Sequence, residues 1–114
     1  MLTAPQTALL LCVMLQRSGH KRARLSKKNI AIVAKRKRLP NAFIVALRDA
    51  MEDYGVALLE LQCGAFGIIY SETLAGARII QPTLLDETER LSPDFAALDS
   101  ELNYQRPDFS SELD

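Results

Sequence analysis

The residues with the clearest chemical potential are lysines and arginines gathered in the first part of the chain. Residues 1–48 hold eleven of the 14 Lys and Arg residues and none of the 14 Asp and Glu residues. The densest run is Lys35–Arg38, with four consecutive cations. Ammonium and guanidinium groups bind phosphate oxygens, and such asymmetry between the halves of a chain indicates an anionic partner. The alternative is that two solvated faces of opposite charge neutralise each other within one fold.

Residue types that carry catalysis or bind metals give a weaker signal. Cys12, Cys63 and the single histidine, His20, are too few for a four-ligand structural zinc site. No serine or cysteine is placed in the sequence to suggest a nucleophile pair with His20. Most carboxylates fall near the C-terminus, where nothing rigid is expected to hold an acid/base pair, and no glycine-rich phosphate loop is present. We therefore predict a non-enzyme with no catalytic residue, metal site or cofactor.

A first helix is predicted from Thr3 to about Arg17. Thr3 is a suitable N-cap, Gln6 completes a capping box, and Gly19 suits a left-handed helix stop. The middle of this helix, residues 9–15, is apolar all round. Such a helix is either central to a core or shares a face with a partner subunit, so a homodimer through this helix is an open alternative.

Two further helices and a hairpin are expected next. Ser26 is a good N-cap for a helix over residues 27–36, and Pro40 forces a break because the residue before proline avoids the helical region. A third helix is predicted over residues 41–54. Residues 56–70 have the apolar runs and the central glycine of a β-hairpin.

The spacing of apolar residues on the third helix predicts which side faces the core. The residues predicted to be buried are Phe43, Ala46, Leu47, Ala50, Met51 and Tyr54. The opposite face then carries Asn41 and Arg48, whose side chains can pair with adenine and guanine edges. The C-terminal half carries Asp49, Glu52 and Asp53, which repel phosphates, so the N-terminal half is the part expected to face a duplex.

The composition changes at Gln81. Residues 81–114 contain nine carboxylates against two arginines, three prolines and no glycine. We interpret residues 1–80 as one domain and the remainder as a loosely ordered acidic tail. Residues 86–91 are expected to form one helical turn, and residues 78–80 are a candidate short strand. We expect the tail to fold back on the basic face and weaken nonspecific binding, or to bind a protein partner.

Nothing in the sequence indicates a membrane segment. The apolar run of residues 8–15 is far too short to span a bilayer, and it lacks the flanking features of a secretory leader. Free thiols fit a reducing compartment. We expect a cytoplasmic protein with no membrane contact.

The order of a long helix, a short strand, two helices and a two-stranded ribbon resembles the winged helix-turn-helix superfamily. The resemblance covers about residues 3–80 and rests on Ala23-Arg24-Leu25-Ser26 before the second helix, Leu39-Pro40 at the turn, and Gly64 and Gly67 in the ribbon. It implies an α+β, mainly helical, three-helix fold with a β-hairpin wing. It also implies that the third helix reads the DNA groove while the second helix and the wing contact the backbone.

The predicted site is a surface for double-stranded DNA. The residues expected to contact it are Arg24, Lys27, Lys28, Lys35, Arg36, Lys37, Arg38, Asn41 and Arg48. Lys27 and Lys28 fall at the positive end of the second helix, where a phosphate would meet both charge and free amides. The ribbon carries no Lys or Arg, so phosphate contact by the wing is not expected. This pattern predicts a small transcriptional regulator or accessory factor.

A protein-interaction module is the alternative function. Ile32, Ile44 and Val45 are predicted to be exposed, the ribbon is free of basic residues, and the tail is acidic. Such a module would be a subunit of a nucleoprotein complex or a phage-type inhibitor of a bacterial defence enzyme.

Overall fold

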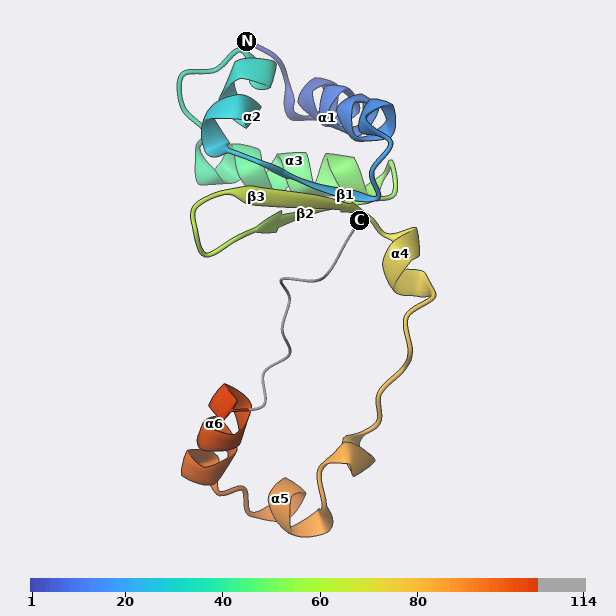
Figure 1. Cartoon of the computed structure of the whole chain (residues 1–114). Helices are drawn as coiled ribbons and strands as arrows, with labels where there is room; N and C mark the ends of the chain where they lie inside the picture. The colour runs from blue at the N-terminus through green and yellow to red at the C-terminus, as the bar shows by residue number, and fades with distance from the viewer. Residues whose placement is uncertain (105–114) are drawn as a thin grey trace. The chain divides into compact units, whose positions relative to one another are not determined.

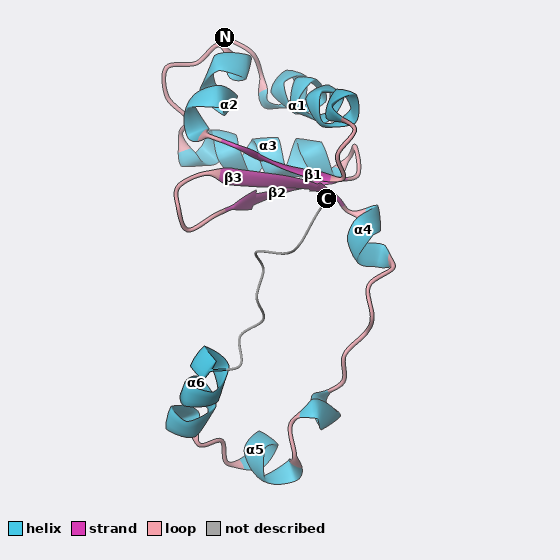
Figure 2. Ribbon diagram, in the orientation of Figure 1, coloured by secondary structure: helices cyan, strands magenta, loops and turns pink. Residues whose placement is uncertain are grey.

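A computed structural model describes residues 1–104, and its fold is α+β, mainly helical, with one small antiparallel sheet. Residues 1–77 form one compact unit, and a second unit begins at Arg78. In the first unit three helices lie on one face of the sheet (Figure 1, Figure 2). The α+β class predicted from the sequence is therefore confirmed.

The first helix, α1, spans Ala4–Ser18 and has the predicted ends. The Thr3 hydroxyl and the Gln6 side chain form the reciprocal capping box, and Gly19 ends the helix with a left-handed φ of 75°. One side of α1 packs in the core through alanine and leucine side chains. The other side is open: the exposed fractions of Leu9, Leu10 and Met14 are 46%, 42% and 41%.

The second and third helices are α2, Lys27–Ala34, and α3, Asn41–Glu52. Ser26 caps α2 as predicted, because its Oγ accepts a hydrogen bond of 3.0 Å from the Asn29 N–H. Both helices end two residues earlier than predicted. In α2 the cause is Lys35, which adopts a left-handed conformation with φ of 55°.

The sheet contains β1 (Arg22–Leu25), β2 (Val56–Glu60) and β3 (Phe66–Tyr70) in the order β1-β3-β2. The predicted hairpin is confirmed, since β2 and β3 pair along their whole length around a turn in which Gly64 has φ of 84°. The short extended piece before α2 also pairs with β3. The expected two-stranded ribbon is therefore part of a three-stranded sheet.

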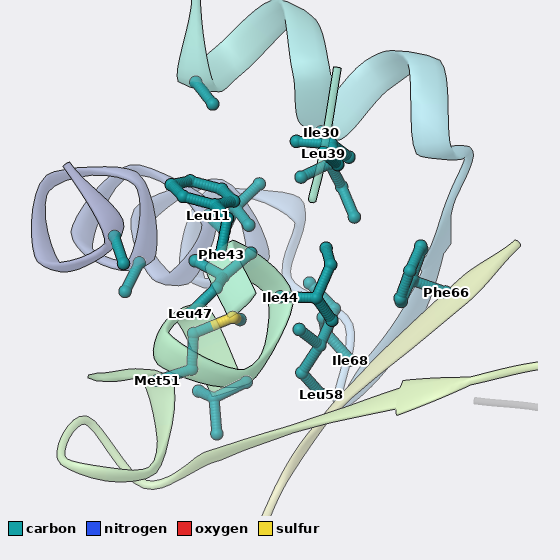
Figure 3. Packing of buried hydrophobic residues seen from close by; sticks show 14 of the residues in the cluster. Leu11, Ile30, Leu39, Phe43, Ile44, Leu47, Met51, Leu58, Phe66 and Ile68 are labelled. Carbon is teal, nitrogen blue, oxygen red and sulfur yellow. The ribbon is translucent and has the colours of Figure 1, made fainter. Parts of the chain in front are cut away.

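The core lies between the three helices and the inner face of the sheet (Figure 3). The largest fully buried side chains are Thr7, Leu11, Leu15, Ile30, Leu47, Met51, Val56 and Leu58. Thr7 is the buried polar residue of this group, and its hydroxyl donates to the Thr3 carbonyl at 2.9 Å. Fully burying a leucine or isoleucine contributes about 1.5–3 kcal/mol, so this layer is what holds α1, α2 and α3 on the sheet.

The buried side of α3 differs from the prediction. The buried residues of α3 are Phe43, Ile44, Leu47 and Met51. Ile44 was expected to be exposed, whereas Ala46 is exposed and Ala50 is only half-buried. Tyr54 is 50% exposed because α3 ends before it and the helical phase is lost. A spacing of 3.6 residues allows either phase, and the position of the sheet decides between them.

Beyond the sheet the chain contains short helices. Helix α4, Glu72–Ala75, contacts β3, and the second unit holds the 3₁₀ turn η1, Pro82–Leu84, followed by α5, Glu87–Leu91, and α6, Phe95–Tyr104. The helical turn predicted at residues 86–91 is confirmed, with Asp86 in a capping box.

Two features of this part of the chain differ from the expectations. Residues 78–80 form no strand, so that prediction is wrong, and α6 was not predicted. None of residues 78–102 is buried. The predicted acidic tail extends beyond residue 104, and its last residues lie outside the described part of the chain.

Candidate nucleic-acid interface

An open pocket with a volume of about 790 Å³ lies where the start of α2 meets the segment between α2 and α3. Its lining residues, called the basic groove below, are Lys27, Lys28, Ala31, Ile32, Arg36, Lys37, Arg38, Leu39 and Pro40. Five of these nine residues are basic and none is acidic. The fold therefore concentrates positive charge on one concave surface, which focuses the field and attracts polyanions.

Local sequence explains how α2 and the following segment form this groove. Lys27, Lys28, Ala31 and Ile32 are spaced so that they share one face of α2, adjacent to the face that buries Ile30 and Ala34. The left-handed residue at position 35 then turns the chain back along that face. Leu39, which is buried, anchors this segment on the hydrophobic core.

Arg36 belongs to the groove wall, but its guanidinium is used by the fold. Its Nε and Nη2 atoms donate hydrogen bonds of 3.2 Å and 2.9 Å to the Leu2 carbonyl oxygen. The Arg36 guanidinium carbon also lies 4.0 Å from the centre of the Phe43 ring, in cation–π geometry. This side chain joins the N-terminal residues, the α2–α3 segment and α3, and it is half-buried. Arg36 therefore contributes mainly to the structure of the groove wall.

Arg48 is also held by the fold. Its Nε donates to the Leu58 carbonyl at 3.2 Å, and the side chain is half-buried. Leu58 lies opposite Ile68 in the hairpin. Leu61 and Ala65 form a hydrogen-bonded pair at the end of the same ladder. Hydrogen-bonded and non-hydrogen-bonded pairs alternate along an antiparallel ladder, so Leu58 and Ile68 form a non-hydrogen-bonded pair. The Leu58 carbonyl therefore points to the free edge of β2, where Arg48 covers it. In this position Arg48 is not directed at a partner.

The remaining predicted contact residues lie outside the groove lining. Arg24 is exposed on β1, and Lys35 is exposed at the end of α2. Asn41 is exposed at the first position of α3, directly after the groove residue Pro40. The structure thus brings together Lys27, Lys28, Arg36, Lys37 and Arg38, and leaves Arg24, Lys35, Asn41 and Arg48 outside the lining.

The exposed face of α3 carries little positive charge. Its outward residues include Val45, Asp49 and Glu52, in addition to Asn41. The acidic residues repel phosphate, as the sequence indicated, so only the start of α3 is suited to a nucleic-acid backbone. The apolar residues that form the groove floor, Ala31, Ile32, Leu39 and Pro40, were not predicted to lie together. The predicted exposure of Ile32 is confirmed.

Residues 1–104 offer few candidates for a metal site or a reactive thiol. No group of three or more His, Cys, Asp or Glu side chains within this range is arranged to hold a metal ion. Cys63 is exposed at the hairpin turn, while Cys12 packs against the core, and burial raises the pKa of the Cys12 thiol. No helix within the same range has the length and apolar character needed to cross a membrane.

No protein-family model, curated protein or solved structure matches this chain.

Proposed function

We propose that this chain is a non-enzymatic nucleic-acid-binding protein that holds double-stranded DNA through its phosphates. The observation that carries the proposal is the basic groove, in which five cations and no carboxylate line one concavity. Lys27, Lys28, Lys37 and Arg38 are exposed there, so they are able to neutralise phosphates and release counterions. The winged helix-turn-helix assignment is part of this proposal, supported by the order of α1, β1, α2, α3 and the hairpin.

The proposed binding mode is backbone contact with little base reading. Arg48 is occupied by the Leu58 carbonyl, and the outward face of α3 ends in acidic residues. Asn41 remains the candidate for a base contact, because it is exposed beside the groove. Phosphate contacts fix position without carrying sequence information, so we expect weak sequence preference. An accessory or architectural role fits this mode better than reading of a defined operator.

The test is fluorescence anisotropy with a labelled random-sequence duplex of about 20 base pairs, at several salt concentrations. Four phosphate contacts should give a slope of log K against log salt of roughly −3 to −4. The double variants Lys27→Ala/Lys28→Ala and Lys37→Ala/Arg38→Ala should each weaken binding about tenfold or more, for every duplex sequence.

Arg17→Ala is the matched control, because Arg17 is an exposed arginine on α1 that does not line the groove. It should change the affinity by less than about threefold. The proposal fails if the chain does not bind the duplex at about 50 mM salt. It also fails if the groove variants bind as well as Arg17→Ala.

A protein-interaction module is the second candidate, and the open face of α1 favours it. Leu9, Leu10 and Met14 are each more than 40% exposed on a helix whose only charged residue is Arg17. Contiguous exposed apolar surface marks sites of protein contact. If this face joins two copies of the chain, the wild type should be dimeric by sedimentation and Leu10→Glu/Met14→Glu monomeric. A wild type that is monomeric at about 100 μM removes the homodimer.

A further inference from the structure

The floor of the basic groove is apolar, and phosphate binding does not use it. Ala31, Ile32, Leu39 and Pro40 lie among the five cations. Ile32 is 63% exposed and lines the groove one helical turn after Lys28 on α2. An isolated exposed isoleucine is ordinary on a protein surface. An exposed isoleucine inside a concavity with charged walls defines a pocket with two chemical requirements.

A ligand that satisfies both requirements must present negative charge and apolar side chains together. A phosphodiester backbone supplies the charge, but its outer surface offers the floor no apolar group to cover Ile32. A helix with leucine or phenylalanine on one face and carboxylates beside them supplies both, since helix-in-groove recognition places apolar anchors at i, i+3, i+4 and i+7. The absence of any acidic residue from the lining removes the repulsion that such a helix would otherwise meet.

We propose that the basic groove also binds an acidic amphipathic helix of a protein partner, with the apolar anchors of that helix on Ile32 and its carboxylates on Lys28, Lys37 and Arg38. The charge complementarity of the lining selects this occupant over a basic or uncharged helix. Duplex DNA and the helix then compete for one surface. The competition depends on the proposed DNA binding. The binding of the acidic helix does not, because it is inferred from the residues that line the groove.

The test is direct binding of the full chain to a labelled 16-residue helical peptide of glutamate, alanine and leucine, with the leucines on one face. A charge-matched peptide with glutamine in place of each leucine is the control. The leucine peptide should bind roughly tenfold more tightly, because covering apolar surface adds to the shared charge term. Unlabelled duplex should displace it. Equal binding of the two peptides, or binding of neither, overturns the proposal.

Variants at the floor separate the two ligands. Ile32→Ser should weaken the leucine peptide about five- to tenfold and the duplex less than twofold, while Ile32→Leu should retain peptide binding. Leu59→Ser is the matched control, because Leu59 is 51% exposed on β2 and does not line the groove. Peptide binding without duplex binding would reject the proposed DNA function and leave this inference standing. A loss of duplex binding in Ile32→Ser, with peptide binding unchanged, would overturn it.

Discussion

Two of the basic residues in the first half of the chain are used by the fold itself. Arg36 closes the N-terminal residues onto α3, and Arg48 covers a carbonyl on the edge of the sheet. Both were predicted as DNA contacts, because a sequence reports the charge of a side chain and not its partner. A buried or half-buried arginine finds backbone carbonyls within its long reach, and a hydrogen bond of this kind contributes about 1.5–3 kcal/mol.

Replacing Arg36 should reduce stability as well as charge. Arg36→Ala removes two hydrogen bonds that share one acceptor, the Leu2 carbonyl, and the stacking on Phe43, so the free energy of unfolding should fall by about 2–3 kcal/mol. Lys37→Ala, one residue further on and exposed, should change it by less than about 0.5 kcal/mol. Urea unfolding followed by circular dichroism measures both values. Equal stability of the two variants would contradict the role assigned to Arg36.

Replacing Arg48 should open the edge of β2. Without its side chain the Leu58 carbonyl is left without a partner on an edge strand, and unpaired edges pair with other chains. Arg48→Ala should therefore increase the apparent mass at high concentration in light-scattering chromatography. Its duplex affinity should fall by less than about threefold. A tenfold loss of affinity with no self-association would instead make Arg48 a direct DNA contact.

At the level of elements, the ends of α2 define the site. The Arg36 N–H donates to the Ala31 carbonyl at 2.9 Å and the Lys35 N–H to the Ile32 carbonyl at 3.1 Å, which is the Schellman arrangement. Position 35 in that arrangement is left-handed and favours glycine. The residue there is lysine, so the turn that brings residues 36–40 along α2 is made at some conformational cost.

Lys35→Gly should therefore stabilise the chain. Glycine removes the left-handed strain at φ of 55°, and the gain in free energy of unfolding should be about 0.5–1 kcal/mol. Gly19→Ala is the converse control, because Gly19 has φ of 75° with no atom within 4 Å of an added Cβ, so its cost is purely conformational. Thermal melts should show opposite shifts. A destabilised Lys35→Gly variant would refute the strain at this turn.

Most element positions could be predicted from the sequence, and the reasons are local. Thr3, Ser26 and Gly19 act within one helical turn, so their capping roles follow from spacing alone. The burial of Ile44, the pairing of β1 with β3, and the assembly of the groove floor depend on contacts between distant segments. Periodicity cannot report such contacts. Helix α6 was missed because residues 81–114 were interpreted together as a loosely ordered acidic tail with little apolar periodicity.

At the level of the whole molecule, the separation of charge along the chain should affect the proposed binding of polyanions. Residues 81–114 carry nine carboxylates and two arginines, tethered to a unit that holds the basic groove. Tethered negative charge repels a duplex at distances up to the Debye length, which is about 10 Å at 0.1 M salt. Association should thus be slower and weaker than the groove alone would allow.

Ending the chain at Ile80 should raise affinity for random duplex roughly three- to tenfold at about 50 mM salt. The gain should disappear near 300 mM salt, where the repulsion is screened. A full-length variant with Asp86→Asn, Glu87→Gln and Glu89→Gln should show part of the same gain without altering chain length. If neither change affects the affinity, the acidic residues have no influence on DNA binding.

The absence of any buried side chain from residue 78 to residue 102 has a consequence for handling the protein. A glutamate-specific protease needs a peptide bond that can be drawn out of its surroundings, and Glu87, Glu89 and Glu101 lie on short helices that no core restrains. Digestion should cleave these bonds long before those at Glu52, at the end of α3, or Glu60, within the paired strand β2. The early product would be a trimmed, strongly cationic fragment, with an isoelectric point well above that of the intact chain.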